Sequence, residues 1–259
     1  MNTKSAVTRV ISKVNVRDVG INEEEFSANI IESPTVNGLY LGWVRKDTQK
    51  WEPLAKLTIV EGGYTAQYTS NHEEISALYP GYKDLLIWSE LDVVNRDFPH
   101  IFRNRMPLLR NDVKNDCEFL KLDYPQIDKI AYVSRYGGRI CGDKFSICPS
   151  IEPDASGNYI FYCALSGVEE RQEPRKIWQQ IRDRSGKFSL IKAEDKYCLE
   201  FEGVILGYLE QYFELIDGEI IQIEIINFTD PSKRQGHSVL LKIIIHGKNA
   251  YAHRLFQDI

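Results

Sequence analysis

Basic and aromatic side chains are the residues of this chain best suited to chemistry. Six arginines and lysines crowd the segment 171–187, two more adjoin each other at 233–234, and three tyrosines stand between positions 197 and 212. Proteins that hold single-stranded nucleic acid combine cations for the phosphates with aromatic rings on which the bases stack. The pattern therefore predicts a DNA-binding site made of Arg171, Arg175, Lys176, Arg182, Arg184, Lys187, Tyr197, Tyr208, Tyr212, Lys233 and Arg234.

The same residues also fit a purely structural interpretation. Arginines and lysines on a helix surface often face solvent or pair with neighbouring carboxylates, and tyrosines are common in protein cores. The sequence leaves both interpretations open at this point.

The overall charge limits the kind of DNA binding to be expected. The 259 residues include 32 Lys and Arg against 37 Asp and Glu, a net charge of −5. A protein that grips duplex DNA through its phosphates needs a broad positive surface. We therefore expect a narrow site that reads a strand or an end.

No motif for catalysis stands out in the sequence. The phosphate loop, the dinucleotide fingerprint, the zinc-protease motif and the nucleophile elbow of hydrolases are all absent. Asp154 with Glu194 and Lys196 matches a metal-nuclease pattern, but Asp154 stands in an ordinary turn sequence, and Glu-x-Lys is frequent by chance. We keep a nuclease as a minor alternative and expect a non-enzymatic protein with no cofactor and no bound metal.

The cysteines and the apolar segments suggest a soluble cytoplasmic protein. The five cysteines show no spacing typical of zinc or redox sites, so we expect them to be buried thiols in a reducing compartment. No apolar stretch is long enough to span a membrane, and the N-terminus lacks the apolar core of a secretory signal.

Alternating patterns predict strands in the first part of the chain. Aromatic-rich segments at 39–44 and 51–59 read as a hairpin, and 64–69 as a third strand after a Gly-Gly turn. A short helix at 98–106 with Asp97 as its N-cap follows. Residues 1–36 are expected to be a partly ordered lead-in in which 9–11 and 14–16 suit an edge strand, and the pattern of 111–149 stays ambiguous between helix and strand.

The second part of the chain predicts more strands. They are expected at 159–165, 188–193, 197–201, 204–209, 220–228 and 237–246, with a basic amphipathic helix at 174–183 and a helical turn at 212–216. We thus predict an α+β, mainly β protein, with a β-meander module and a small OB-like β-barrel. The expected divisions are 1–36, 37–110, 111–157 and 158–259.

Residues 159–245 resemble a HIRAN domain, a small barrel found in some DNA translocases and in stand-alone bacterial proteins. The resemblance rests on 161–167 as first strand, the helix with Trp178, the segment 185–190 and above all Gly-Val-Ile-Leu-Gly-Tyr-Leu at 203–209. It implies recognition of single-stranded DNA and 3′ ends. Glu210 stands where the family usually has proline, and residues 192–199 depart from the family's Asn-Pro loop, which helps to form its nucleic-acid site.

Residues 38–106 resemble, more weakly, the N-terminal subdomain of HipA-type kinases. A hairpin, a Gly-Gly turn before Tyr64 and Tyr68, Leu85-Leu86 and the closing Phe-Pro segment at 98–105 carry the resemblance. That subdomain is non-catalytic and can regulate a kinase in toxin–antitoxin systems. No kinase catalytic segment follows it here.

These observations lead to two alternative functions. The first is a DNA-binding or DNA-end-sensing accessory protein of a bacterial antiviral defence, repair or toxin–antitoxin system, acting with a partner protein that supplies catalysis. The second is an antitoxin-like interaction module that regulates a kinase or nuclease without binding DNA itself. Neither involves a membrane.

Overall fold

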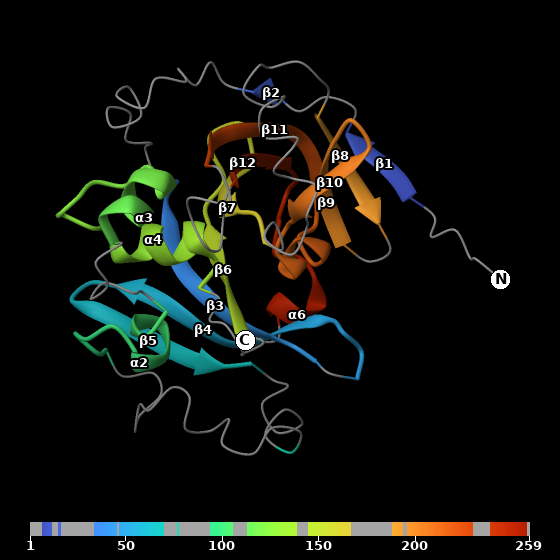
Figure 1. The fold of residues 1–259 in the computed structure, drawn as a ribbon. Coiled ribbons are helices and arrows are strands. Elements are labelled where there is room, and N and C mark those ends of the chain that lie inside the picture. The colour runs from blue at the N-terminus through green and yellow to red at the C-terminus, as the bar shows by residue number, and fades with distance from the viewer. Residues whose placement is uncertain are drawn as a thin grey trace.

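The computed structural model describes residues 7–11, 15–16, 34–45, 47–69, 77, 94–105, 113–138, 145–166, 188–193, 196–229 and 239–257. They form three four-stranded sheets and several short helices (Figure 1). The fold is mainly β within the α+β class, as the sequence predicts.

The first sheet is the predicted meander with one additional strand. A tight turn, in which Gly62 takes the left-handed φ of 84°, joins its second and third strands. The additional strand comes from the region whose pattern was ambiguous, and all pairings are antiparallel. In spatial order the strands are β5 (Gly63–Tyr68), β4 (Trp51–Val60), β3 (Val36–Val44) and β6 (Phe145–Ile151).

The other two sheets contain the strands predicted in the second half and two from the N-terminus. The edge-strand segments around residues 9–11 and 14–16 are confirmed: one pairs with the third sheet and the other, in parallel, with the second. The second sheet has the order β2 (Asn15–Val16), β11 (Glu219–Phe228), β12 (Val239–His246) and β7 (Asn158–Ala164). The third has the order β1 (Val7–Ile11), β8 (Phe188–Ala193), β9 (Lys196–Phe201) and β10 (Val204–Tyr208).

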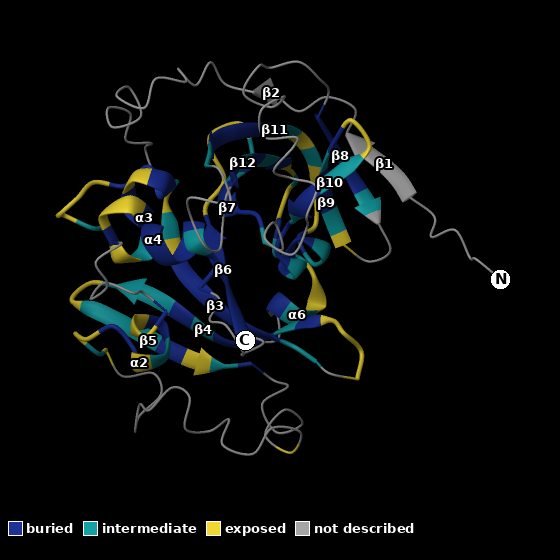
Figure 2. Cartoon of the chain, in the orientation of Figure 1, coloured by how far each residue is buried: buried dark blue, intermediate teal, exposed yellow. Residues whose placement is uncertain are grey.

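Two hydrophobic cores hold the sheets together. The junction core contains Tyr40, Phe161, Tyr212 and Phe256 and lies between parts of all three sheets. The helix core contains Phe102, Phe119 and Tyr132 and lies between the first sheet, the second sheet and the helices. Each core draws residues from both sides of residue 157, so the two halves of the chain share their buried surface (Figure 2).

Strand β7 shows why its sequence is continuously apolar. Successive side chains of a strand point to opposite faces, and both faces of β7 are covered. Its alternate residues therefore enter different cores: Tyr159, Phe161 and Cys163 the junction core, and Ile160, Tyr162 and Ala164 the helix core.

Two helices occupy the ambiguous region. They are α3 (Val113–Leu120) and α4 (Lys129–Tyr136), which lie side by side against the second sheet (Figure 1). The Asp128 side chain caps α4 by accepting a 3.0 Å hydrogen bond from the backbone N–H of Ala131. Gly137 ends the helix in the left-handed conformation, with φ of 76°.

The predicted helix at 98–106 is shorter and capped differently. It is α2 (His100–Arg103), and its N-cap is Pro99 without a side-chain cap hydrogen bond. The prediction of Asp97 as the N-cap was wrong because Pro99 has an extended ψ of 144°, which delays the first helical residue to His100.

Several predictions lie outside the described residues, among them the helix at 174–183, the Leu85-Leu86 pair and Cys141. Cys117, Cys148, Cys163 and Cys198 are buried, as predicted. The described C-terminal strands pair as two sheets joined by one bridge between Ser166 and Tyr208, and closure into a barrel stays a prediction. Among the described helices, none has the length and apolar character needed to cross a bilayer.

Candidate nucleic-acid interface

Tyr208 and Lys196 meet on the outer face of the third sheet, the face turned away from the junction core. Ser189, Ile191 and Cys198 on the same face are buried, so the accessible part of the face is the end that holds Lys196. Tyr208 on β10 pairs directly with Cys198 on β9, and Lys196 stands two residues before Cys198, so all three side chains share one face. The Lys196 ammonium lies 5.7 Å from the centre of the Tyr208 ring. Lys196 is exposed and Tyr208 is half-buried. The pair thus presents a cation beside an accessible aromatic ring.

Tyr197 lies on the opposite face of the same sheet. It packs against the junction core and pairs across the strands with Lys192, whose ammonium is 5.2 Å from the ring centre. Lys192 also forms a 2.5 Å ion pair with Glu214 of the 3-10 helix η3 (Gln211–Glu214). Burial raises the pKa of Tyr197, while the neighbouring Lys192 opposes that rise. Tyr197 is therefore partly covered and engaged on the core side.

Tyr212 is a core residue. Its side chain is fully buried, stacks on Phe213 with ring centres 4.7 Å apart, and meets the edge of Trp51 at 5.9 Å. Its hydroxyl has no hydrogen-bond partner in the described structure, and burial raises its pKa well above the usual value. No face of this ring is open to a base.

The structure separates the three tyrosines that were predicted to stack bases. Alternation along β9 places Tyr197 on the core side, η3 carries Tyr212 into the core, and Tyr208 alone remains on the outer face. The eight predicted basic residues, Arg171, Arg175, Lys176, Arg182, Arg184, Lys187, Lys233 and Arg234, lie outside the described residues.

Backbone pairing links the start of the basic segment to Tyr208. Ser166 and Tyr208 exchange two backbone N–H to carbonyl hydrogen bonds, each 2.9 Å long. The segment 167–187, which carries six of the predicted cations, begins at the next residue after Ser166. Arg171, the first of these cations, follows Ser166 by five residues and lies outside the described residues.

The sequence-based set of site residues missed Lys196. The signal that could have found it is the alternation of β9 read together with the pairing of β9 and β10, which places Lys196 and Tyr208 on one face. Lys196 drew notice only as part of the nuclease pattern. Within that pattern, the Asp154 carboxylate accepts hydrogen bonds from the backbone N–H groups of Ser156 and Asn158. These hydrogen bonds lower the pKa of Asp154 and engage its carboxylate in the turn before β7. Glu194 lies outside the described residues.

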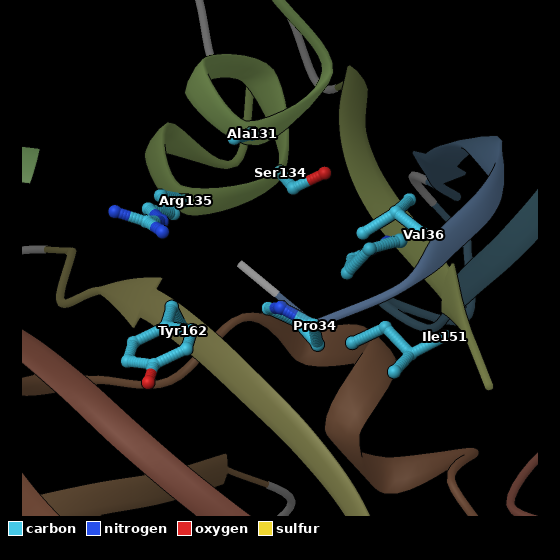
Figure 3. Close-up of a pocket in the computed structure, with 8 residues that line it drawn as sticks. Pro34, Val36, Ala131, Ser134, Arg135, Ile151 and Tyr162 are labelled. Atoms are coloured by element: carbon cyan, nitrogen blue, oxygen red, sulfur yellow. The ribbon is translucent and has the colours of Figure 1, made fainter. Parts of the chain in front are cut away.

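A buried arginine lines a small cavity beneath α4 (Figure 3). Arg135 from α4 and Tyr162 from β7 face it, with the guanidinium 5.0 Å from the ring centre. The cavity measures about 10 Å³, room for one water at most. Arg135 donates hydrogen bonds to the carbonyls of Leu120 and Lys121, and burial lowers its pKa to about 10. Its role is to provide hydrogen-bond donors for the backbone carbonyls at the C-terminal end of α3, which have no partner within the helix.

These features define a mainly β protein of the α+β class with a lysine–tyrosine pair on an outer sheet face. No protein-family model, curated protein or solved structure matches this chain. In the described part of the chain, no three His, Cys, Asp or Glu side chains gather as metal ligands.

Proposed function

We propose that this protein is a non-enzymatic DNA-binding accessory protein that holds a single strand or a strand end where Lys196 of β9 and Tyr208 of β10 meet on the outer face of the third sheet. The observation that carries the proposal is the exposed Lys196 beside the accessible Tyr208 ring. A base can stack on the ring while the ammonium contacts the adjoining phosphate.

The charges of this face favour a narrow site. Glu200 stands two residues beyond Cys198 on the same face. The positive charge of this face is therefore confined to the end where Lys196 lies beside Tyr208. The segment 167–187, which follows Ser166 in the sequence, carries six of the eight predicted cations. The net charge of −5 agrees with binding of a strand rather than of a long duplex.

The biological setting in this proposal rests on the HIRAN and HipA resemblances. It is a bacterial antiviral defence, repair or toxin–antitoxin system, in the cytoplasm, in which a partner protein supplies catalysis. The lysine–tyrosine pair would then deliver that partner to a DNA strand or end.

The test is a fluorescence anisotropy titration of single-stranded DNA at low salt. One set of strands carries the label at the 5′ end and leaves the 3′ end free, and the other set is labelled at the 3′ end. Tyr208→Leu should weaken binding by about 10-fold, because the loss of one stacked base costs about 1–3 kcal/mol. Tyr124→Leu is the matched control, since Tyr124 is 49% exposed in the turn between α3 and α4, away from this face.

The proposal fails if the unmodified protein leaves the anisotropy of every strand unchanged, or if Tyr208→Leu binds as tightly as the Tyr124→Leu control. In that case the antitoxin-like interaction module is the better account. It would be recognised by a stoichiometric complex with the product of a neighbouring gene after co-expression.

A further inference from the structure

A groove with an apolar floor and basic side chains in its wall lies beside Leu215, the residue that follows η3. It measures about 320 Å³ and is formed by the start of β4, by Leu215 after η3, and by residues at the start of α6 (Arg254–Gln257). This volume is at the lower end of the range for small-molecule sites. Segments about 200 residues apart in the sequence thus build one concave surface.

Cationic and hydrogen-bond-donating side chains form one part of the wall of the groove. Lys50, His253 and Arg254 line it and are exposed. The acidic lining residue is Glu52, whose carboxylate lies 3.4 Å from the Arg45 guanidinium, a group that also pairs with Asp47 at 2.7 Å. An anion that enters the groove therefore meets positive charge from two sides.

The orientation of His253 favours an acceptor ligand. Its Nδ1 accepts a 3.3 Å hydrogen bond from the backbone N–H of Leu255. In the neutral ring the proton must then be on Nε2, which leaves Nε2 as a donor. In its neutral form His253 can thus donate a hydrogen bond from Nε2 to an anion while Nδ1 keeps its backbone contact.

The floor of the groove is rigid and apolar. Trp51 is buried, and its indole N–H donates a 2.8 Å hydrogen bond to the Ser146 hydroxyl. The indole lies so close to Gly42 that an added Cβ there would overlap the ring. Leu215 and Leu255 complete the lining. A fixed apolar floor below a basic wall suits a ligand with one anionic group and one less polar part.

We propose that this groove binds a phosphate monoester. A terminal phosphate carries up to two negative charges and offers several acceptor oxygens, which matches Lys50, Arg254 and the Nε2 donor of His253. The phosphate belongs either to a free small molecule or to the phosphorylated end of a nucleic-acid strand. The inference is independent of the proposed stacking on Tyr208.

The experiment is isothermal titration calorimetry of the full chain with adenosine 5′-monophosphate, with adenosine as the unphosphorylated control. The monophosphate should bind and adenosine should not. Lys50→Ala and Arg254→Gln should each weaken binding by at least ~10-fold, a factor that corresponds to about 1.4 kcal/mol. Lys114→Ala is the matched control, because Lys114 is an exposed lysine on α3 whose partner, Glu118, is on the same helix.

Further titrations identify the source of the phosphate and keep the two proposals apart. A 5′-phosphorylated oligonucleotide that competes better than the monophosphate indicates a strand end, and the reverse indicates a small molecule. Tyr208→Leu should leave binding of the monophosphate unchanged. Equal binding of adenosine and its monophosphate, no heat with either, or unchanged affinity in both groove variants would overturn the inference, provided the variants keep the thermal midpoint of the original protein.

Discussion

Tyr208 and Tyr212 are four residues apart, yet they lie in two contrasting regions of the molecule. Tyr208 is on the outer sheet face beside Lys196. Tyr212 belongs to η3, and its side chain is buried in the junction core. Both residues are tyrosines, so the difference in their burial comes from the strand alternation at Tyr208 and from the short helix η3 at Tyr212. The comparison teaches that an aromatic residue near a basic segment is a candidate for stacking only when the sheet leaves its ring open.

Several tyrosines and cysteines in and around the junction core are held neutral by burial. Burial raises the pKa values of Tyr251, Tyr212, Cys148 and Cys163, all of which lie between the sheets. The outer face instead holds an exposed lysine. We therefore expect changes in the junction core to alter stability, and changes on the outer face to alter binding.

The largest expected effect is at Tyr212. Tyr212→Ala should lower the free energy of unfolding by about 3–5 kcal/mol, because it leaves a large cavity in the junction core. Tyr212→Phe should be nearly neutral, since the hydroxyl has no hydrogen-bond partner in the described structure. Denaturant titration measures both. Comparable losses for Tyr212→Ala and Tyr208→Ala would break the contrast between the regions.

Alkaline pH should destabilise the protein through buried tyrosine and cysteine side chains in both cores. Burial raises the pKa of Tyr40 to about 12 and that of Cys117 to about 11. Above about pH 9 the unfolded chain loses these protons first, so the folded state binds more protons and stability falls as pH rises. Unfolding midpoints measured from pH 8 to pH 11 should decrease steadily. A flat profile over this range would mean that these groups titrate normally and that the core is wetter than described.

A moderate effect is expected at the half-buried ion pair on the core side of the third sheet. Lys192→Met should cost about 1 kcal/mol of stability through the loss of its pair with Glu214. The double variant with Glu214→Gln should recover part of this cost, because no carboxylate is then left without its partner. A double-variant cycle of unfolding free energies checks this, and strictly additive losses would show that the two side chains do not interact.

The smallest effect is expected at Lys196. Lys196→Gln should leave stability unchanged and reduce the slope of log K against log salt for single-stranded DNA by about 0.7, the value for one phosphate contact. Lys114→Gln serves as the control. An unchanged slope for Lys196→Gln would remove this lysine from the interface and leave the ring of Tyr208 without its phosphate contact.

Much of the fold follows from local patterns, because hairpins and alternation are encoded over a few residues. The meander from β3 to β5 and the strands β8 to β12 were predictable in this way. Strand β6 and helices α3 and α4 were not, because they are short and their type depends on partners distant in the sequence. The N-terminal strands were suggested by their alternation, but their partners in the C-terminal half were not.

The candidate site was predictable only in part. The strand that contains Tyr208 was predicted, whereas the burial of Tyr212 depends on its packing against Trp51 and Phe213. Lys196 was missed because its importance depends on the cross-strand register with β10. The phosphate groove was invisible for the same reason, since Lys50 and Arg254 meet only in the folded chain.

The most direct test of the contrast between the two tyrosines is nitration by tetranitromethane, mapped by mass spectrometry with and without saturating single-stranded DNA. Tyr208 should be nitrated in the free protein and protected by DNA, Tyr124 should be nitrated in both states, and Tyr212 in neither. Nitration of Tyr208 that is unaffected by DNA, or ready nitration of Tyr212 in the native protein, would contradict the account.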